Sequence, residues 1–182
     1  DMDTAEQHVL RLEEVAPDNP DTLFVKALIE RARGDHDRAL ELFSDIYKSN
    51  PSRESMLALS RQMWGMGDRQ GSLTLQSQWI TDHPEDIPAR IALANSYMAS
   101  KQKQSAVDEY STVLRYHPDN VIALNNLAWL LRDSDPDQAL SFATQAYKLY
   151  PKSDNIIDTY AMTLINSGKK AEGLKLSLDL AA

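Results

Sequence analysis

The 182-residue chain contains no cysteine, which excludes disulfide frameworks, thiol nucleophiles and thiolate metal sites. It has no apolar run of the ~18–20 residues that span a bilayer, so we expect no membrane insertion within this sequence. Basic residues are scarce: 19 lysines and arginines stand against 27 aspartates and glutamates, a formal charge of −8. Binding of phosphates requires clustered cations, so we expect no nucleic-acid partner. The chain begins with Asp1 and shows no secretion signal.

Apolar residues make up 42% of the chain and charged residues 25%, which is typical of a folded protein. Five of the eight prolines recur at spacings of 34, 33, 34 and 33 residues. These prolines are Pro17, Pro51, Pro84, Pro118 and Pro151. Two columns of small residues keep the same period, one twelve residues before each proline and one ten residues after it. They are Ala5, Ala39, Ser72, Ala106 and Ala139, and Ala27, Arg61, Ala94, Ala128 and Ala161.

Each period contains two stretches in which apolar residues recur every three to four positions, the pattern of an amphipathic helix. The recurring proline ends the second stretch, because proline cannot continue a helix. Turn residues such as Gly34-Asp35 and Gly67-Asp68 separate the two stretches. The pattern predicts helices near 3–15, 20–32, 36–48, 54–66, 69–82, 87–99, 103–116, 121–132, 136–149, 154–166 and 170–181.

A helix-turn-helix unit of 34 residues with these columns resembles the tetratricopeptide repeat (TPR) family. The resemblance implies an all-α fold, a right-handed superhelical α-solenoid of helix pairs, with one array over residues 1–182. Residues 1–19 would be the second helix of a truncated repeat, so we expect the N-terminus to lie inside a longer array. The full repeats are expected at 20–53, 54–86, 87–120, 121–153 and 154–182. The unit at 54–86 departs most, since Arg61 and Ser72 replace alanine there, and we expect its helix pairing to be looser or shifted in register.

In the family, ligands lie along the inner groove formed by the first helix of each pair. The register predicts a peptide-binding groove of apolar, amide and thioether side chains with few charges. The predicted groove residues are Phe24, Leu28, Arg31, Gln62, Met66, Ile91, Asn95, Met98, Asn125, Asn126, Trp129, Arg132, Asp158 and Met162. The alternative is that some of these side chains pack only against the neighbouring helix.

The carboxylate-clamp subfamily, which holds chaperone C-terminal tails, combines two asparagines with three cations. Asn95 and Asn126 match the asparagines, but Ile91, Asn155 and Thr159 stand where the cations belong. A terminal carboxylate would therefore be poorly compensated, and we reject binding of chaperone tails.

Residues 125–174 are similar to the closing repeats of bacterial TPR proteins of envelope and exopolysaccharide machinery. These include the lipoproteins of the PEP-CTERM/exosortase system. The similarity rests on Asn-Asn-Leu-Ala-Trp at 125–129 and on Asp-Thr-Tyr at 158–160. It implies a periplasmic or envelope-associated location in preference to a cytoplasmic one.

No catalytic motif of the HExxH, P-loop, GxGxxG or GxSxG type occurs, and we expect no catalytic residues, no metal and no cofactor. His83 and His117 each precede a recurring proline. Equivalent residues of stacked units lie roughly 10 Å apart, too far to share a metal, so both are interpreted as helix-end residues.

Three functions remain open. The first, which we favour, is a non-catalytic scaffold that binds peptide or protein segments within a bacterial envelope, exopolysaccharide or protein-sorting assembly. The second is an accessory domain of a larger enzyme such as a glycosyltransferase, which a catalytic module in the complete reading frame would reveal. The third is a spacer that self-associates through its terminal helices, where leucines recur at 174, 176, 178 and 180.

Overall fold

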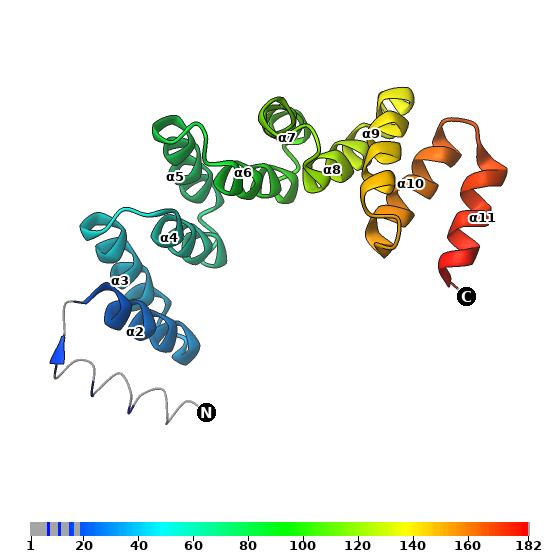
Figure 1. Cartoon of the computed structure of the whole chain (residues 1–182). Helices are drawn as coiled ribbons and strands as arrows, with labels where there is room; N and C mark the ends of the chain where they lie inside the picture. Colours follow the sequence, from blue (N-terminus) through cyan, green and yellow to red (C-terminus); the bar gives the residue numbers. More distant parts are fainter. Residues whose placement is uncertain (1–6, 8–10, 12–14, 17–18, 182) are drawn as a thin grey trace. The chain divides into compact units, whose positions relative to one another are not determined.

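The computed structural model describes residues 7, 11, 15–16 and 19–181, and residues 19–181 form ten helices and no strand (Figure 1). The helices are α2 (Pro20–Arg33), α3 (His36–Ser49), α4 (Arg53–Gly65), α5 (Arg69–Asp82), α6 (Ile87–Ala99), α7 (Lys103–Tyr116), α8 (Val121–Leu131), α9 (Pro136–Leu149), α10 (Asp154–Asn166) and α11 (Lys170–Ala181). The predicted all-α class, a solenoid of helix pairs, is confirmed. The helix predicted at 3–15 falls largely outside the described residues.

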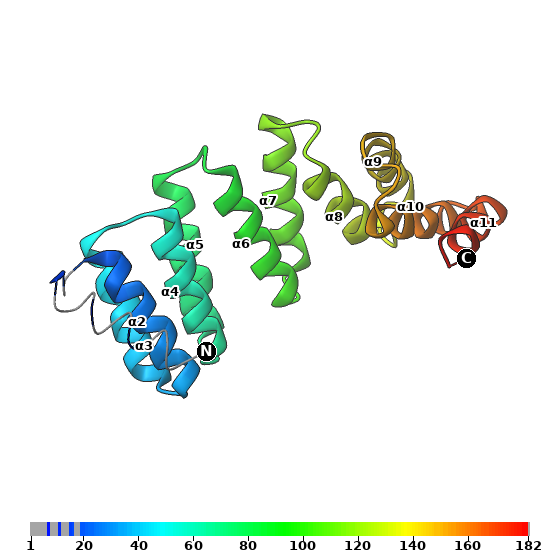
Figure 2. The same ribbon diagram turned by 60° about the horizontal axis from the view of Figure 1, so that its bottom comes forward.

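The chain divides into two compact units, Asp1–Ala89 and Arg90–Ala182. In the first unit α2 packs on α3 and α4 on α5, as hairpins. In the second unit α8 packs on α9 and α10 on α11, and the two views show these pairs side by side (Figure 1, Figure 2). Within each unit the second helix of a hairpin also packs on the first helix of the next, as α3 does on α4 and α9 on α10. Inside a unit, neighbouring hairpins therefore bury apolar surface against each other.

Four hairpin turns place one residue in the left-handed region of the backbone, at positions 34, 67, 101 and 168. In the first, Gly34 lies in the left-handed region with φ 89°, and its N–H donates to the carbonyl of Arg31. Asp35 then caps α3, since its carboxylate accepts from the N–H of Arg38 at 3.0 Å. In the turn between α6 and α7 the same left-handed position holds Lys101, with φ 59°. A residue with a side chain thus occupies a conformation that favours glycine.

The small-residue columns form the helix contacts in both units. The alanines of both columns from Ala27 to Ala161 are fully buried, which lets the helices approach closely. Larger side chains fill the spaces between them. Phe24 of α2 meets Phe43 of α3 edge-to-face at 5.5 Å, and Tyr110 of α7 is completely buried in the second unit.

The divergent repeat is shifted in register by one residue. A capping box between Ser52 and Ser55 starts α4 at Arg53, two residues after its proline, whereas α2, α6, α8 and α10 start three residues after theirs. Ser60 therefore occupies the buried column and Arg61 is exposed. The Oγ atoms of Ser60 and Ser72 lie 2.8 Å apart, and a buried glutamine, Gln76, donates to Ser60 at 2.7 Å. Hydrogen bonds thus replace the usual alanine contacts between α4 and α5.

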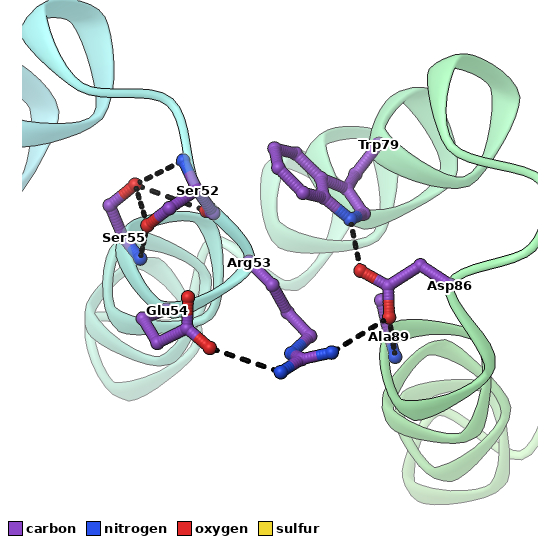
Figure 3. Close-up of polar contacts among 7 residues, drawn as sticks. All are labelled: Ser52, Arg53, Glu54, Ser55, Trp79, Asp86 and Ala89. Atoms are coloured by element: carbon purple, nitrogen blue, oxygen red, sulfur yellow. Dashed lines mark hydrogen bonds and ion pairs between the residues drawn. The ribbon is translucent and has the colours of Figure 1, made fainter.

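Asp86 joins three segments of the first unit (Figure 3). Its carboxylate accepts from the indole of Trp79 at 3.0 Å, from Arg53 at 3.2 Å and from the N–H of Ala89 at 3.1 Å. Burial by itself would raise the pKa of Asp86, but the hydrogen bonds from Trp79, Ala89 and Arg53 outweigh it and lower the pKa below its usual value. His83 stacks on Trp79 at 3.9 Å, and its Nδ1 lies 3.1 Å from that residue's carbonyl oxygen, as predicted for a helix-end histidine.

Candidate functional site

Two cavities of the second unit meet at Trp129, on the last turn of α8. Trp129 is 46% exposed, whereas tryptophan is highly buried on average in folded proteins. The first cavity measures about 310 Å³ and is lined by Met98, Lys101, Lys103, Trp129, Leu130, Arg132 and Asp133. The second measures about 240 Å³ and is lined by Trp129, Arg132, Asp158, Thr159, Met162 and Thr163. Trp129 and Arg132 line both cavities and are their shared wall.

Interactions within the chain hold this wall in place. The guanidinium of Arg132 lies over the indole of Trp129, 4.3 Å from the ring centroid, and donates to the Trp129 carbonyl at 2.7 Å. Its Nε lies 3.6 Å from the carboxylate of Asp133. Asn166 of α10 donates to that carboxylate at 3.1 Å and to the carbonyl of Arg132 at 3.3 Å. The indole is therefore presented in a fixed orientation, which lowers the entropy cost of binding.

Five of the predicted groove residues line these cavities. Met98 lies in the first cavity, Asp158 and Met162 in the second, and Trp129 and Arg132 in both. They come from α6, from α8 and the residue that follows it, and from α10, the first helices of three successive hairpins. These five residues therefore line cavities of the second unit, and their binding of a peptide stays a prediction.

The hydroxyl of Tyr110, on α7, hydrogen-bonds both Asn95 of α6 and Asn126 of α8. That hydroxyl donates to Asn95 Oδ1 and accepts from Asn126 Nδ2 at 2.9 Å. Burial raises the pKa of Tyr110 to about 12, so the bridge stays neutral at physiological pH. These two amides are therefore partly committed to packing. Ile91 and Asn125 are half-buried and line neither cavity.

The predicted groove residues of the first unit do not line these cavities. Phe24 and Leu28 pack against the core around Phe43, and Arg31 lies 6.0 Å over the Phe43 ring. Met66 is exposed at the end of α4. Gln62 corrects the prediction, because it is only 2% exposed and donates to the carbonyl of His36 at 3.0 Å. The one-residue shift of α4 turned this side chain inward.

Sequence reasoning missed the two lysines of the first cavity. Lys101 lies in the turn and Lys103 begins α7, whereas the prediction considered only first helices. One signal was present in the sequence. Lys101 stands at the position where three other turns have Gly34, Gly67 and Gly168, and a lysine in place of a turn glycine is a departure that invites a functional explanation.

Within residues 19–181 and the few described residues before them, no group of three or more histidines, aspartates or glutamates is placed to hold a metal ion. Over the same residues, no helix combines the length and apolar character needed to cross a bilayer.

A tetratricopeptide repeat family model matches residues 1–54 and 91–154 of this chain. A curated relative, the BBSome complex member BBS4 of Xenopus tropicalis, is 23% identical over 138 residues. That match covers 75% of this chain but 27% of the relative, so the chain spans about a quarter of that protein's length.

Solved structures share the fold at low identity. A crystal structure of MamA protein has a TM-score of 0.71 and 15% identity, and the match covers 88% of this chain and 89% of that one. MamA from Desulfovibrio magneticus has a TM-score of 0.74 and 14% identity, with 90% and 94% covered. A tetratricopeptide repeat protein from Parabacteroides merdae has a TM-score of 0.76 and 18% identity, with 88% and 65% covered.

Proposed function

The chain belongs to the tetratricopeptide repeat family, and from that premise we propose that it is a non-catalytic scaffold that binds a segment of a protein partner. The observation that carries the proposal is the exposed Trp129 between two cavities of the second unit. Tryptophan, arginine and methionine are enriched in protein interfaces, and tryptophan and arginine are enriched where the binding energy concentrates. The two cavities contain all three residue types in their lining, as Trp129, Arg132, Met98 and Met162.

The size of the cavities supports a peptide ligand. Pockets that enclose a drug-sized molecule measure about 300–1,000 Å³. The two cavities, at about 310 and 240 Å³, are at or below the lower end of that range. Each suits one or two side chains of a bound segment, and the shared wall of Trp129 and Arg132 separates neighbouring side chains of the ligand.

A random library of displayed 12-residue peptides, selected on the immobilised protein, tests this function without knowledge of the partner. Selected peptides are retested on Trp129→Ala, and truncation of a central tryptophan is expected to weaken binding by at least tenfold. Trp64→Ala is the matched control, because Trp64 in the first unit also carries an arginine, Arg69, over its ring at 5.6 Å. We expect peptides that bind the control normally and lose affinity for Trp129→Ala. A library that yields only peptides insensitive to Trp129 would refute the proposed site.

We propose further that the scaffold works in a bacterial envelope or exopolysaccharide assembly of the PEP-CTERM type. The similarity of residues 125–174 to closing repeats of such proteins supports this context. Fractionation of cells that make the full-length protein at its native level tests it. Recovery with the periplasm or envelope is expected, and recovery in the cytoplasm alone would overturn the proposal.

A second function, self-association, is favoured by the surface of α11. Leu178 is 71% exposed and Leu174 is 46% exposed on this helix. We propose that a second copy of the chain covers these leucines. Light scattering over a hundredfold concentration range should then show a mass above the monomer that Leu178→Glu abolishes. A monomeric mass at all concentrations excludes this function.

A further inference from the structure

We infer that the segment bound at the first cavity is acidic: it presents an aspartate or glutamate side chain to Lys101, Lys103 and Arg132, next to an apolar side chain on Trp129 and Met98. This inference rests on the proposed function, because it specifies the chemistry of the segment bound there. It follows from the charges that line the cavity and from the apolar surface between them.

The first cavity is a basic site on an acidic protein. Three cations line it together with one carboxylate, Asp133, in a chain whose formal charge is −8. The carboxylate of Asp133 lies 3.6 Å from Nε of Arg132. Lys101 and Lys103 have no ion pair in the described part of the chain, and the nearest recorded polar partner of Lys103 is the hydroxyl of Ser134 at 3.4 Å. Two positive charges are thus left for a ligand to compensate.

The surrounding sequence makes this turn more positive than its counterparts. In three other hairpins an aspartate caps the second helix: Asp35, Asp68 and Asp135. The equivalent residue before α7 is Gln102, which carries no charge and makes no capping bond through its side chain. The capping carboxylate that these three hairpins carry is therefore absent beside Lys101.

The apolar lining strengthens the attraction for a carboxylate. Trp129, Leu130 and Met98 form the cavity wall next to the cations. Apolar walls exclude water and lower the local dielectric constant, so a charge pair at their edge is stronger than one in open solvent. The same wall offers an apolar contact to the side chain that neighbours the acidic one, which favours a peptide over a free inorganic anion.

An anionic membrane is a poorer fit. Recognition of lipid headgroups at a surface uses clusters of about 4–8 basic residues. This cavity offers three cations in a confined space, and the acidic remainder of the protein would be repelled by an anionic bilayer. We therefore assign an acidic peptide segment as the occupant.

The peptides selected from the 12-residue library provide the test. Those that depend on Trp129 are expected to carry a more negative net charge than the input library. For the tightest of them, fluorescence anisotropy compares the synthetic peptide with a counterpart in which every aspartate and glutamate is the corresponding amide. We expect the amide counterpart to bind at least tenfold more weakly and the acidic peptide to lose affinity as salt rises.

Three variants locate the effect. Lys101→Gly and Lys103→Gln should each weaken the acidic peptide about two- to fivefold, the range for partly exposed ion pairs. Lys148→Gln, an exposed lysine of α9 outside both cavities, should leave the affinity unchanged. Lys101→Gly is expected to fold, because glycine already occupies this turn position at Gly34, Gly67 and Gly168, and circular dichroism checks it.

The possible results distinguish failure of the acidic-segment inference from failure of the proposed function. Trp129-dependent peptides that are neutral or basic, or an amide counterpart that binds equally well, would overturn the acidic segment and leave the scaffold function intact. Equal loss of affinity in Lys148→Gln and Lys101→Gly would also overturn it. The absence of any Trp129-dependent peptide would refute the binding site at Trp129 that carries the proposed function and, with it, this inference.

Discussion

Replacing Lys101 with glycine should stabilise the protein while it weakens ligand binding. Lys101 has φ 59°, in the left-handed region. A side chain there costs about 1–2 kcal/mol per residue relative to right-handed backbone. Glycine removes that cost but loses about 0.5–1 kcal/mol more conformational entropy on folding. The net expectation is about 0.5–1 kcal/mol of added stability, which corresponds to a rise in Tm of about 1–4 °C for a chain of this length.

Urea unfolding followed by circular dichroism measures this change, and two variants serve as controls. Lys101→Ala removes the charge but keeps the Cβ atom, so it should not stabilise. Gly34→Ala is the converse test: its added Cβ would meet no atom within 4 Å, so the φ of 89° alone should destabilise it by about 1 kcal/mol. If Lys101→Gly and Lys101→Ala have the same stability, the lysine backbone is not strained and the reasoning is refuted.

Three further predictions concern hydrogen bonds that are buried or partly buried. Asp86→Asn should lower the free energy of unfolding by about 1–2 kcal/mol at pH 7. Because the folded-state pKa of Asp86 is lowered, the stability that its carboxylate contributes is present above the unfolded pKa and is lost as pH falls through the folded pKa. Unfolding measured at pH 2 and pH 7 should therefore show the variant's loss of stability only at pH 7. Tyr110→Phe should cost about 1–2 kcal/mol in urea and remove the tyrosine absorbance change near pH 12. Gln76→Ala should cost about 1–3 kcal/mol by leaving Ser60 short of a buried donor, and an unchanged urea midpoint would contradict this.

The bounds of the helices could be predicted closely because the residues that start and end a helix lie next to it in the sequence. The expected helix at 87–99 is α6, Ile87–Ala99, and that at 36–48 is α3, His36–Ser49. Prolines, turn glycines and capping aspartates mark these ends through backbone chemistry that needs no tertiary information. The register of α4 was the exception, since Ser52 and Ser55 form a capping box that outweighs the spacing from the proline.

The candidate site could be predicted only in part. Trp129 and Met162 share a position in successive first helices, and Met98 matches the position of Arg132, about one turn further along, so helical period alone predicts one face for all of them. Lys101 and Lys103 reach the same cavity from a turn and from a second helix. The helical period of the first helices does not predict the position of either lysine. Which lysines reach a cavity depends on the packing of three segments and on side-chain direction, and neither can be obtained from spacing along the chain.

The most direct test of the central claim is the indole N–H region of a ¹H–¹⁵N NMR spectrum. The chain has three tryptophans, at positions 64, 79 and 129, so three indole resonances are expected and single substitutions assign them. On addition of a selected peptide, the account predicts that the Trp129 resonance shifts in proportion to occupancy while those of Trp64 and Trp79 stay in place. A bound peptide that shifts Trp64 or Trp79 and leaves Trp129 unchanged would contradict it.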